Sequence, residues 1–227
     1  MPSFRPSPPR TEDELHERAL ALAGLPLAHI AGRFGQKVPP DLRRDKGWIG
    51  NLLETALGAT AKSRAEPDFP HLGVEMKTLP VRTDGRPLES TYVCTAPLDG
   101  SLEARWEDSW VRHKLARVLW VPIVGERGSP PGERRVGTPL LWTPTPEQDA
   151  ALRADWEALT ELIRLGELWQ IDAKKGRFLQ LRPKAAHRRE TTWTLDEDGE
   201  WARANPRGFY LRTRFTRALL ERHYRLG

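Results

Sequence analysis

An aspartate followed by a Glu-x-Lys triplet is the part of this sequence best suited to chemistry. Asp68 is separated by six residues from Glu75, and Lys77 follows two residues later. The positions that alternate with Glu75 and Lys77 are apolar, so a strand of period two would place both charged side chains on one face. Pro67 and Pro70 interrupt the backbone before this strand, which predicts that Asp68 lies on a turn or a short preceding strand.

Two carboxylates that converge beside one ammonium group suit a Mg²⁺ site for phosphodiester hydrolysis. Hard oxygen ligands hold such a metal, and a cation then lies near the attacked phosphate. Glu54, on a neighbouring predicted helix, is a candidate for a third carboxylate. The alternatives are ordinary: a Glu/Lys pair on a solvated strand edge, and a helix glutamate that faces solvent.

The composition favours a globular protein with a polyanionic partner. The 227 residues are enough for one large domain or two closely joined lobes. Mean hydropathy is -0.60, which predicts a soluble chain with a wide polar surface. Lysine and arginine number 36 against 31 acidic residues, and the sequence pI is about 9.6. This balance favours nucleic acid, although many ordinary enzymes carry a similar excess.

Cysteine usage and hydropathy predict a reducing, cytoplasmic setting. Cys94 is the only cysteine, which excludes an intramolecular disulfide and a cysteine-based zinc site. The N-terminal residues lack the apolar run of a signal peptide, and we find no segment apolar enough to cross a bilayer. We expect no membrane association.

Capping signals and apolar periodicity predict a mixed α/β protein. The expected helices cover residues 11–25, 27–33, 46–58, 109–116, 145–163 and 215–224. The expected strands cover residues 72–77, 90–96, 118–124, 178–182, 191–195 and 208–212. A turn near Gly85 predicts a hairpin between the first two strands.

Five segments, in the same order along the chain, carry a family resemblance. They are RDKGWIG at 44–50, LGVEMKT at 72–78, VRHKL at 111–115, RPKAA at 182–186 and PRGFYL at 206–211. These segments closely resemble the MutH family, the strand-nicking endonucleases of methyl-directed DNA mismatch repair. The likeness extends from about Thr11 to the C-terminus.

The resemblance implies a restriction-endonuclease-like fold of the PD-(D/E)xK superfamily, with a central mixed sheet flanked by helices. It implies a single endonuclease domain over residues 1–227, with a catalytic lobe near 11–105 and a DNA-recognition lobe near 106–227 that form a clamp. Such a monomer would use Mg²⁺, with Mn²⁺ as a substitute, to nick the unmethylated strand of a hemimethylated GATC site, 5′ of the G. MutL, recruited by mismatch-bound MutS, would activate it.

The same resemblance implies roles for the catalytic candidates. Asp68 and Glu75 would bind the metal, with the backbone carbonyl of Met76 as a further oxygen ligand. Lys77 would orient or help to deprotonate the attacking water and would stabilise charge on the phosphate. Glu54 would complete the carboxylate cluster, directly or through a metal-bound water.

Further matched positions concern DNA recognition. Arg182 suits bidentate bonding to guanine O6 and N7, and Lys184 suits a base edge or a phosphate. Tyr210 matches the position that senses adenine methylation, where a hydroxyl would bond a free N6 amino group and would be crowded by a methyl. Lys114 matches a position linked to activity, although a helix lysine is usually solvated. The remaining DNA-facing positions are Lys46, Gly47, Tyr92 and Pro183.

One segment departs from the resemblance, and two other functions compete with it. Residues 187–205 look little like the family, so the loop contacts and the MutL-binding surface stay open. A type II restriction endonuclease that cuts both strands at GATC would need two active sites or dimerisation, whereas this chain carries one complete motif. A GATC-binding module that does not cut would have no need of two acids near a phosphate.

Overall fold

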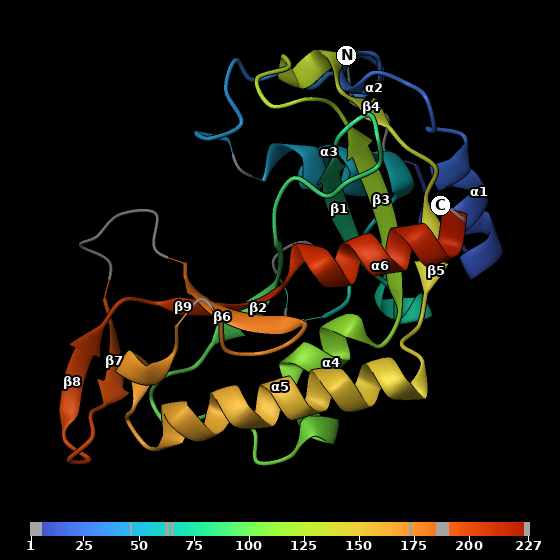
Figure 1. The fold of residues 1–227 in the computed structure, drawn as a ribbon. Coiled ribbons are helices and arrows are strands. Elements are labelled where there is room, and N and C mark those ends of the chain that lie inside the picture. The colour runs from blue at the N-terminus through green and yellow to red at the C-terminus, as the bar shows by residue number, and fades with distance from the viewer. Residues whose placement is uncertain are drawn as a thin grey trace. The chain divides into compact units, whose positions relative to one another are not determined.

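The computed structural model describes residues 6–45, 47–61, 64, 66–172, 174–184 and 191–224 (Figure 1). The chain divides into two compact units. Unit 1 contains the residues up to Leu88 together with Arg117–Thr143, and unit 2 contains Glu89–Ala116 together with the residues from Pro144 onward. The chain therefore passes between the units three times, whereas the lobes expected from the sequence follow from a single division near residue 105.

Unit 1 is built on a mixed sheet. β1 (Glu75–Val81) pairs in parallel with β3 (Val118–Val124). β3 also pairs antiparallel with β4 (Arg135–Val136) and with β5 (Leu140–Trp142). The apolar run at 118–124 predicted β3 with its correct bounds, and its burial on both faces explains why that run is continuous. The sequence did not predict β4 and β5, which have two and three residues.

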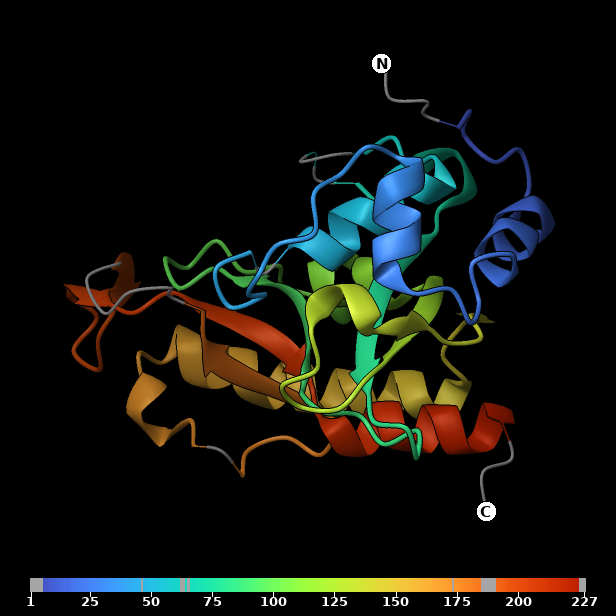
Figure 2. The same ribbon diagram turned by 90° about the horizontal axis from the view of Figure 1, so that it is seen from above.

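Three helices gather beside this sheet, as the blue and cyan ribbons of Figures 1 and 2 show. They are α1 (Glu12–Leu20), α2 (Leu27–Arg33) and α3 (Trp48–Leu57). Thr11 caps α1 as predicted, because its hydroxyl accepts a hydrogen bond from the Glu14 amide at 3.1 Å. α1 ends earlier than the expected residue 25. Apolar residues of all three helices form one core cluster with Met76 of β1 and with Leu119, Val121 and Ile123 of β3.

Unit 2 contains an antiparallel sheet in the order β2-β9-β6 and a separate hairpin. The sheet strands are β2 (Thr91–Ala96), β6 (Leu179–Pro183) and β9 (Arg207–Leu211), and the hairpin strands are β7 (Thr192–Leu195) and β8 (Trp201–Ala204). The helices are α4 (Trp110–Leu115), α5 (Pro146–Arg164) and α6 (Thr213–Tyr224). Unit 2 also contains the short 3-10 helices η2 (Trp106–Asp108) and η4 (Leu168–Gln170), and unit 1 contains η1 (Pro70–Leu72) and η3 (Pro131–Glu133). The mixed α/β class expected from the sequence is confirmed.

The predicted hairpin between the first two strands is wrong. The chain does reverse after β1, since the Leu88 amide donates to the Pro80 carbonyl at 2.9 Å and Val81 forms an isolated bridge with Pro87. Proline has no amide hydrogen, so Pro80 and Pro87 cannot donate to a ladder at these positions. β2 instead pairs with β9 in unit 2.

A buried aspartate joins the long helix of unit 2 to the start of β6. Asp155 is 8% exposed, and its carboxylate accepts three backbone N–H groups. They belong to Arg177 at 2.6 Å, Phe178 at 2.6 Å and Leu179 at 2.8 Å. The predicted apolar stripe of α5, the helix that carries Asp155, is also buried. Packing of this helix and the hydrogen bonds of Asp155 together fix the start of β6. In the described part of the chain, we find no helix long and apolar enough to span a bilayer.

Asp155→Ala should destabilise the protein by about 3 kcal/mol or more, because it leaves three backbone donors without their charged acceptor. Chemical denaturation monitored by circular dichroism measures this loss. Asp172→Ala is the matched control, since that carboxylate accepts two backbone N–H groups at an exposed turn. Its loss should cost much less, because water can replace the carboxylate at this exposed turn. Equal losses in the two variants would contradict the anchoring role of Asp155.

Candidate active site

Glu75 and Lys77 form a buried ion pair on one face of β1. The Lys77 Nζ lies 3.2 Å from the Glu75 Oε1, and the two residues are 7% and 6% exposed. The shared face follows from the strand period, as the sequence predicted. The alternative of a pair on a solvated strand edge is wrong, because burial removes water from both charges. Such burial costs free energy that an ordinary surface pair does not, which marks the pair as a candidate functional group.

Asp68 lies against the start of the same strand. Its Oδ2 accepts the Met76 amide at 2.8 Å, while the amide of Glu75 points the other way and donates to the Arg117 carbonyl at 3.0 Å. The amide and carbonyl of one strand residue point toward the same edge, so the Met76 carbonyl emerges on the edge where Asp68 lies. The backbone carbonyl of Asp68 accepts the Thr60 amide, which holds this segment to the chain that follows α3.

The oxygen groups on and beside β1 are of the kind that a hard divalent cation prefers. They are the carboxylates of Asp68 and Glu75 and the carbonyl of Met76, all of them oxygen ligands, and Mg²⁺ commonly uses one or two carboxylates with several waters. Glu54 is half-buried on α3. Among the described residues, no group of three His, Cys, Asp or Glu side chains is gathered to hold a metal ion. Glu54 is therefore not part of a preformed three-carboxylate group.

Lys114, Gly47 and Lys46, three further candidates for catalysis or DNA contact, do not lie on β1. Lys114 is half-buried on α4 and belongs to unit 2, whereas the Glu75–Lys77 pair belongs to unit 1. Gly47 is the N-terminal cap of α3, and Lys46 lies outside the described residues.

Five of the predicted recognition residues lie in, or directly after, strands of the β2-β9-β6 sheet. Tyr92 and Tyr210 are direct cross-strand neighbours, with their rings edge to face at 5.3 Å. The Arg182 guanidinium lies 5.7 Å from the centre of the Tyr210 ring, and the Lys184 Nζ lies 4.8 Å from the centre of the Tyr92 ring. Pro183 is the last residue of β6, between the two cations. The sheet thus presents two cations over two aromatic rings.

Two hydroxyl groups that the sequence did not single out hold these cations. Arg182 Nη1 donates to the Ser90 Oγ at 2.6 Å, and Lys184 Nζ donates to the Thr95 Oγ1 at 2.7 Å. The Thr95 hydroxyl also lies 2.9 Å from the Tyr92 hydroxyl. A register shift between Tyr92 and residue 94 lets two residues of opposite parity meet. Strand alternation alone could not predict this contact.

Gly208 leaves room for the two tyrosine rings. A Cβ at this position would lie 2.9 Å from Cε2 of Tyr92 and 3.3 Å from Cε2 of Tyr210, so a side chain would displace a ring. Burial, followed by the neighbouring Tyr92, raises the pKa of the Tyr210 hydroxyl. That hydroxyl therefore stays protonated at physiological pH and can both donate and accept a hydrogen bond.

The mixed sheet flanked by helices, with an acidic residue upstream of a buried Glu-x-Lys, places this chain in the restriction-endonuclease-like class. The family model described as DNA mismatch repair enzyme MutH matches residues 57–155. The chain is 55% identical over 216 residues to the DNA mismatch repair protein MutH of Vibrio cholerae serotype O1 (strain M66-2), covering 95% of this chain and 98% of the relative. It is 54% identical over 219 residues to that of Shewanella amazonensis, covering 96% and 98%. The chain belongs to the MutH family.

Lys77→Met should destabilise the protein by about 3–5 kcal/mol, because the buried Glu75 carboxylate loses its ammonium partner. Adding Glu75→Gln should recover most of that loss, since the remaining buried charge is removed. Urea denaturation of the single and double variants measures both effects. Arg217→Met, which removes an exposed pair with Glu221, should cost less than about 1 kcal/mol. A double variant less stable than Lys77→Met would contradict the pairing argument.

Proposed function

We propose that this chain hydrolyses one phosphodiester bond in the unmethylated strand of a hemimethylated GATC site, on the 5′ side of the G. The observation that carries this proposal is the buried Glu75–Lys77 pair, with Asp68 bonded to the strand between them through the Met76 amide. Membership of the MutH family supports a nuclease of DNA mismatch repair.

Asp68 and Glu75, with the carbonyl of Met76, would hold a divalent cation, which we propose is Mg²⁺ with Mn²⁺ as a substitute. When bound, the cation polarises the phosphate and lowers the pKa of a water molecule. Lys77, fixed by its bond to Glu75, orients or helps to deprotonate the attacking water. Its positive charge stabilises the charge that develops on the phosphate.

Two further residues have auxiliary roles in the proposal. Glu54 contributes to metal binding directly or through a metal-bound water. Lys114 matches a position that the family resemblance links to activity, and we include it among the catalytic residues on that ground.

Recognition depends on the sheet of unit 2. Arg182 bonds to guanine O6 and N7, and the neutral Tyr210 hydroxyl bonds to the free adenine N6 amino group and is crowded by a methyl. The hydrogen bond that Arg182 donates to Ser90 and the nearby Tyr210 ring orient Arg182 before DNA binds, which lowers the entropy cost of recognition. Further DNA contacts come from Lys46, Gly47, Tyr92, Pro183 and Lys184.

The cellular context completes the proposal. The protein acts as a monomer on cytoplasmic, nucleoid-associated DNA, and MutL, recruited by mismatch-bound MutS, activates it. The excess of basic residues supports a polyanionic partner.

The first test uses closed circular plasmids that carry one GATC site in unmethylated, hemimethylated or fully methylated form. With Mg²⁺ at low salt, we expect open circles from the first two plasmids only, and the hemimethylated nick should lie in the unmodified strand. Linear product would support a restriction endonuclease instead. If no plasmid is cut, adding MutL should restore nicking, and continued inactivity would support a binding module that does not cleave.

Asp68→Asn should reduce nicking by more than about 100-fold, since even residues that only support metal ligands can cost up to ~100-fold. The asparagine oxygen can still accept the Met76 amide, so the strand should keep its geometry. Binding to a GATC duplex, measured by fluorescence anisotropy, should be retained. Loss of binding together with a lower melting temperature would show that Asp68 has a structural role.

Arg182→Ala should weaken binding to a GATC duplex by about 1–3 kcal/mol while binding to a GATC-free duplex changes little. Anisotropy titrations on both duplexes measure the difference. Arg203→Ala is the matched control, because Arg203 is another exposed arginine of unit 2 that lies over an aromatic ring, that of Trp193. Equal weakening on both duplexes by Arg182→Ala would reduce Arg182 to a phosphate contact.

A further inference from the structure

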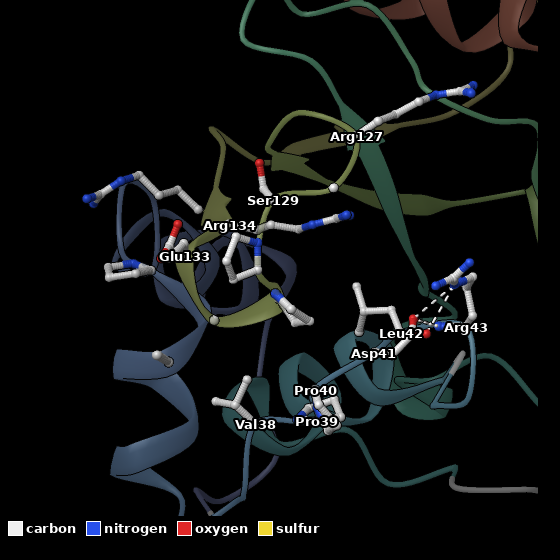
Figure 3. A pocket seen from close by; sticks show the side chains of 17 residues that line it. Val38, Pro39, Pro40, Asp41, Leu42, Arg43, Arg127, Ser129, Glu133 and Arg134 are labelled. Atoms are coloured by element: carbon white, nitrogen blue, oxygen red, sulfur yellow. Dashed lines mark hydrogen bonds and ion pairs between the residues drawn. The ribbon is translucent and has the colours of Figure 1, made fainter.

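A hollow of about 1300 Å³ lies within unit 1, between residues 38–43 and residues 127–135 (Figure 3). It is separate from the residues of the candidate active site. Five prolines, together with Val38 and Leu42, supply much of its lining, and four arginines supply its charge. An apolar wall beside guanidinium groups is suited to a ligand that has an apolar face and an anionic group.

The charge balance of the hollow is positive. Its four arginines face two carboxylates, Asp41 and Glu133. Arg43 is already paired with Asp41 at 3.1 Å, and Arg135 donates to the Gly24 carbonyl at 2.8 Å. Arg127 likewise donates to the Leu88 carbonyl at 3.4 Å, and bonds to neutral carbonyls leave the charge of an arginine in place, so three arginines exceed the one remaining carboxylate. In Figure 3 the Arg134 guanidinium extends to the right, the side on which Arg43 lies, whereas the Arg127 guanidinium extends to the upper right, away from Pro39 and Pro40.

Arg134 is held in place with a donor that lacks an acceptor. Its side-chain stem packs on Gly125, where a Cβ would lie 2.8 Å from the Arg134 Cγ. Its Nε is buried and has no hydrogen-bond partner among the described residues. A buried donor without an acceptor costs about 1–3 kcal/mol, so such a group calls for an explanation. This Nε is closed to solvent, so an anion in the hollow could bond only to the terminal guanidinium nitrogens of Arg134.

We propose that this hollow binds a phosphate group of the duplex backbone, with Arg134 and Arg127 on the phosphate and the prolines against the sugar. The proposal rests on the proposed function, because the backbone would belong to the DNA that the enzyme cuts. The wall at 38–43 leads directly into Gly47 and α3, so this contact would extend the DNA-facing segment at the start of that helix. A phosphate contact positions the duplex and carries no sequence information.

The test compares DNA binding by Arg134→Gln and Arg127→Gln across a series of salt concentrations. Binding weakens as salt rises, so the slope of log K against log[salt] is negative. Each lost phosphate contact should make this slope shallower by about 1, equally on GATC and GATC-free duplexes. Arg127 is exposed, so its variant tests the proposal even if Arg134→Gln fails to fold. Arg217→Gln is the matched control, an exposed arginine bonded to Glu221, and should leave the slope unchanged.

Free phosphate is the other source of the same chemistry, and pyrophosphate in a thermal-shift assay tests it. If pyrophosphate stabilises the unmodified protein but not Arg134→Gln, while the DNA slopes stay unchanged, the site holds a free anion and the assignment to DNA is overturned. Unchanged slopes with no effect of pyrophosphate overturn the phosphate site altogether.

Nicking of the GATC plasmid by the same preparation separates this proposal from the proposed function. If the protein nicks the plasmid and the salt slopes of the variants are unchanged, the proposed function is supported and the phosphate site is contradicted. If the protein does not nick even with MutL, but the salt slopes of the variants become shallower, the proposed function is contradicted and the phosphate site is retained.

Discussion

The buried pair of Glu75 and Lys77 is the constraint on which unit 1 depends. Two charges can be removed from water only if they are held close together and bonded, and here they are 3.2 Å apart on adjacent same-face positions of β1. The parallel pairing with β3 fixes that strand, and Met76 between them packs into the core cluster on the opposite face. The strand period therefore lets one short segment serve both the core and the candidate site.

In unit 2, hydrogen bonds and aromatic rings restrict the cationic side chains of the sheet. The cationic side chains that we propose read DNA are long and flexible, and such side chains lose entropy when they bind a partner. The sheet restricts them beforehand, since Arg182 and Lys184 are bonded to hydroxyls and lie over tyrosine rings. Asp155 fixes the start of β6, the strand that carries Arg182 and leads into Lys184. Rigid backbone pairing thus orders the residues that we propose read DNA.

The two units are linked by the order of the chain. β1 and β3 pair side by side, but the residues between them include β2 and α4, which belong to the other unit. β2 in turn pairs with β9, more than one hundred residues later in the chain. Each sheet therefore depends on contacts between distant segments, which form against a larger loop-closure entropy than local contacts do.

The sequence by itself determined most elements, the family and the shared face of Glu75 and Lys77. Capping residues such as Thr145, apolar periodicity and the five matched segments are local signals, which act within a few residues. Only the tertiary structure decided that β1 pairs with β3, that its charged pair is buried, and that Thr95 meets Tyr92 across a bulge. Strand partners and burial depend on distant segments of the chain, so no local pattern specifies them.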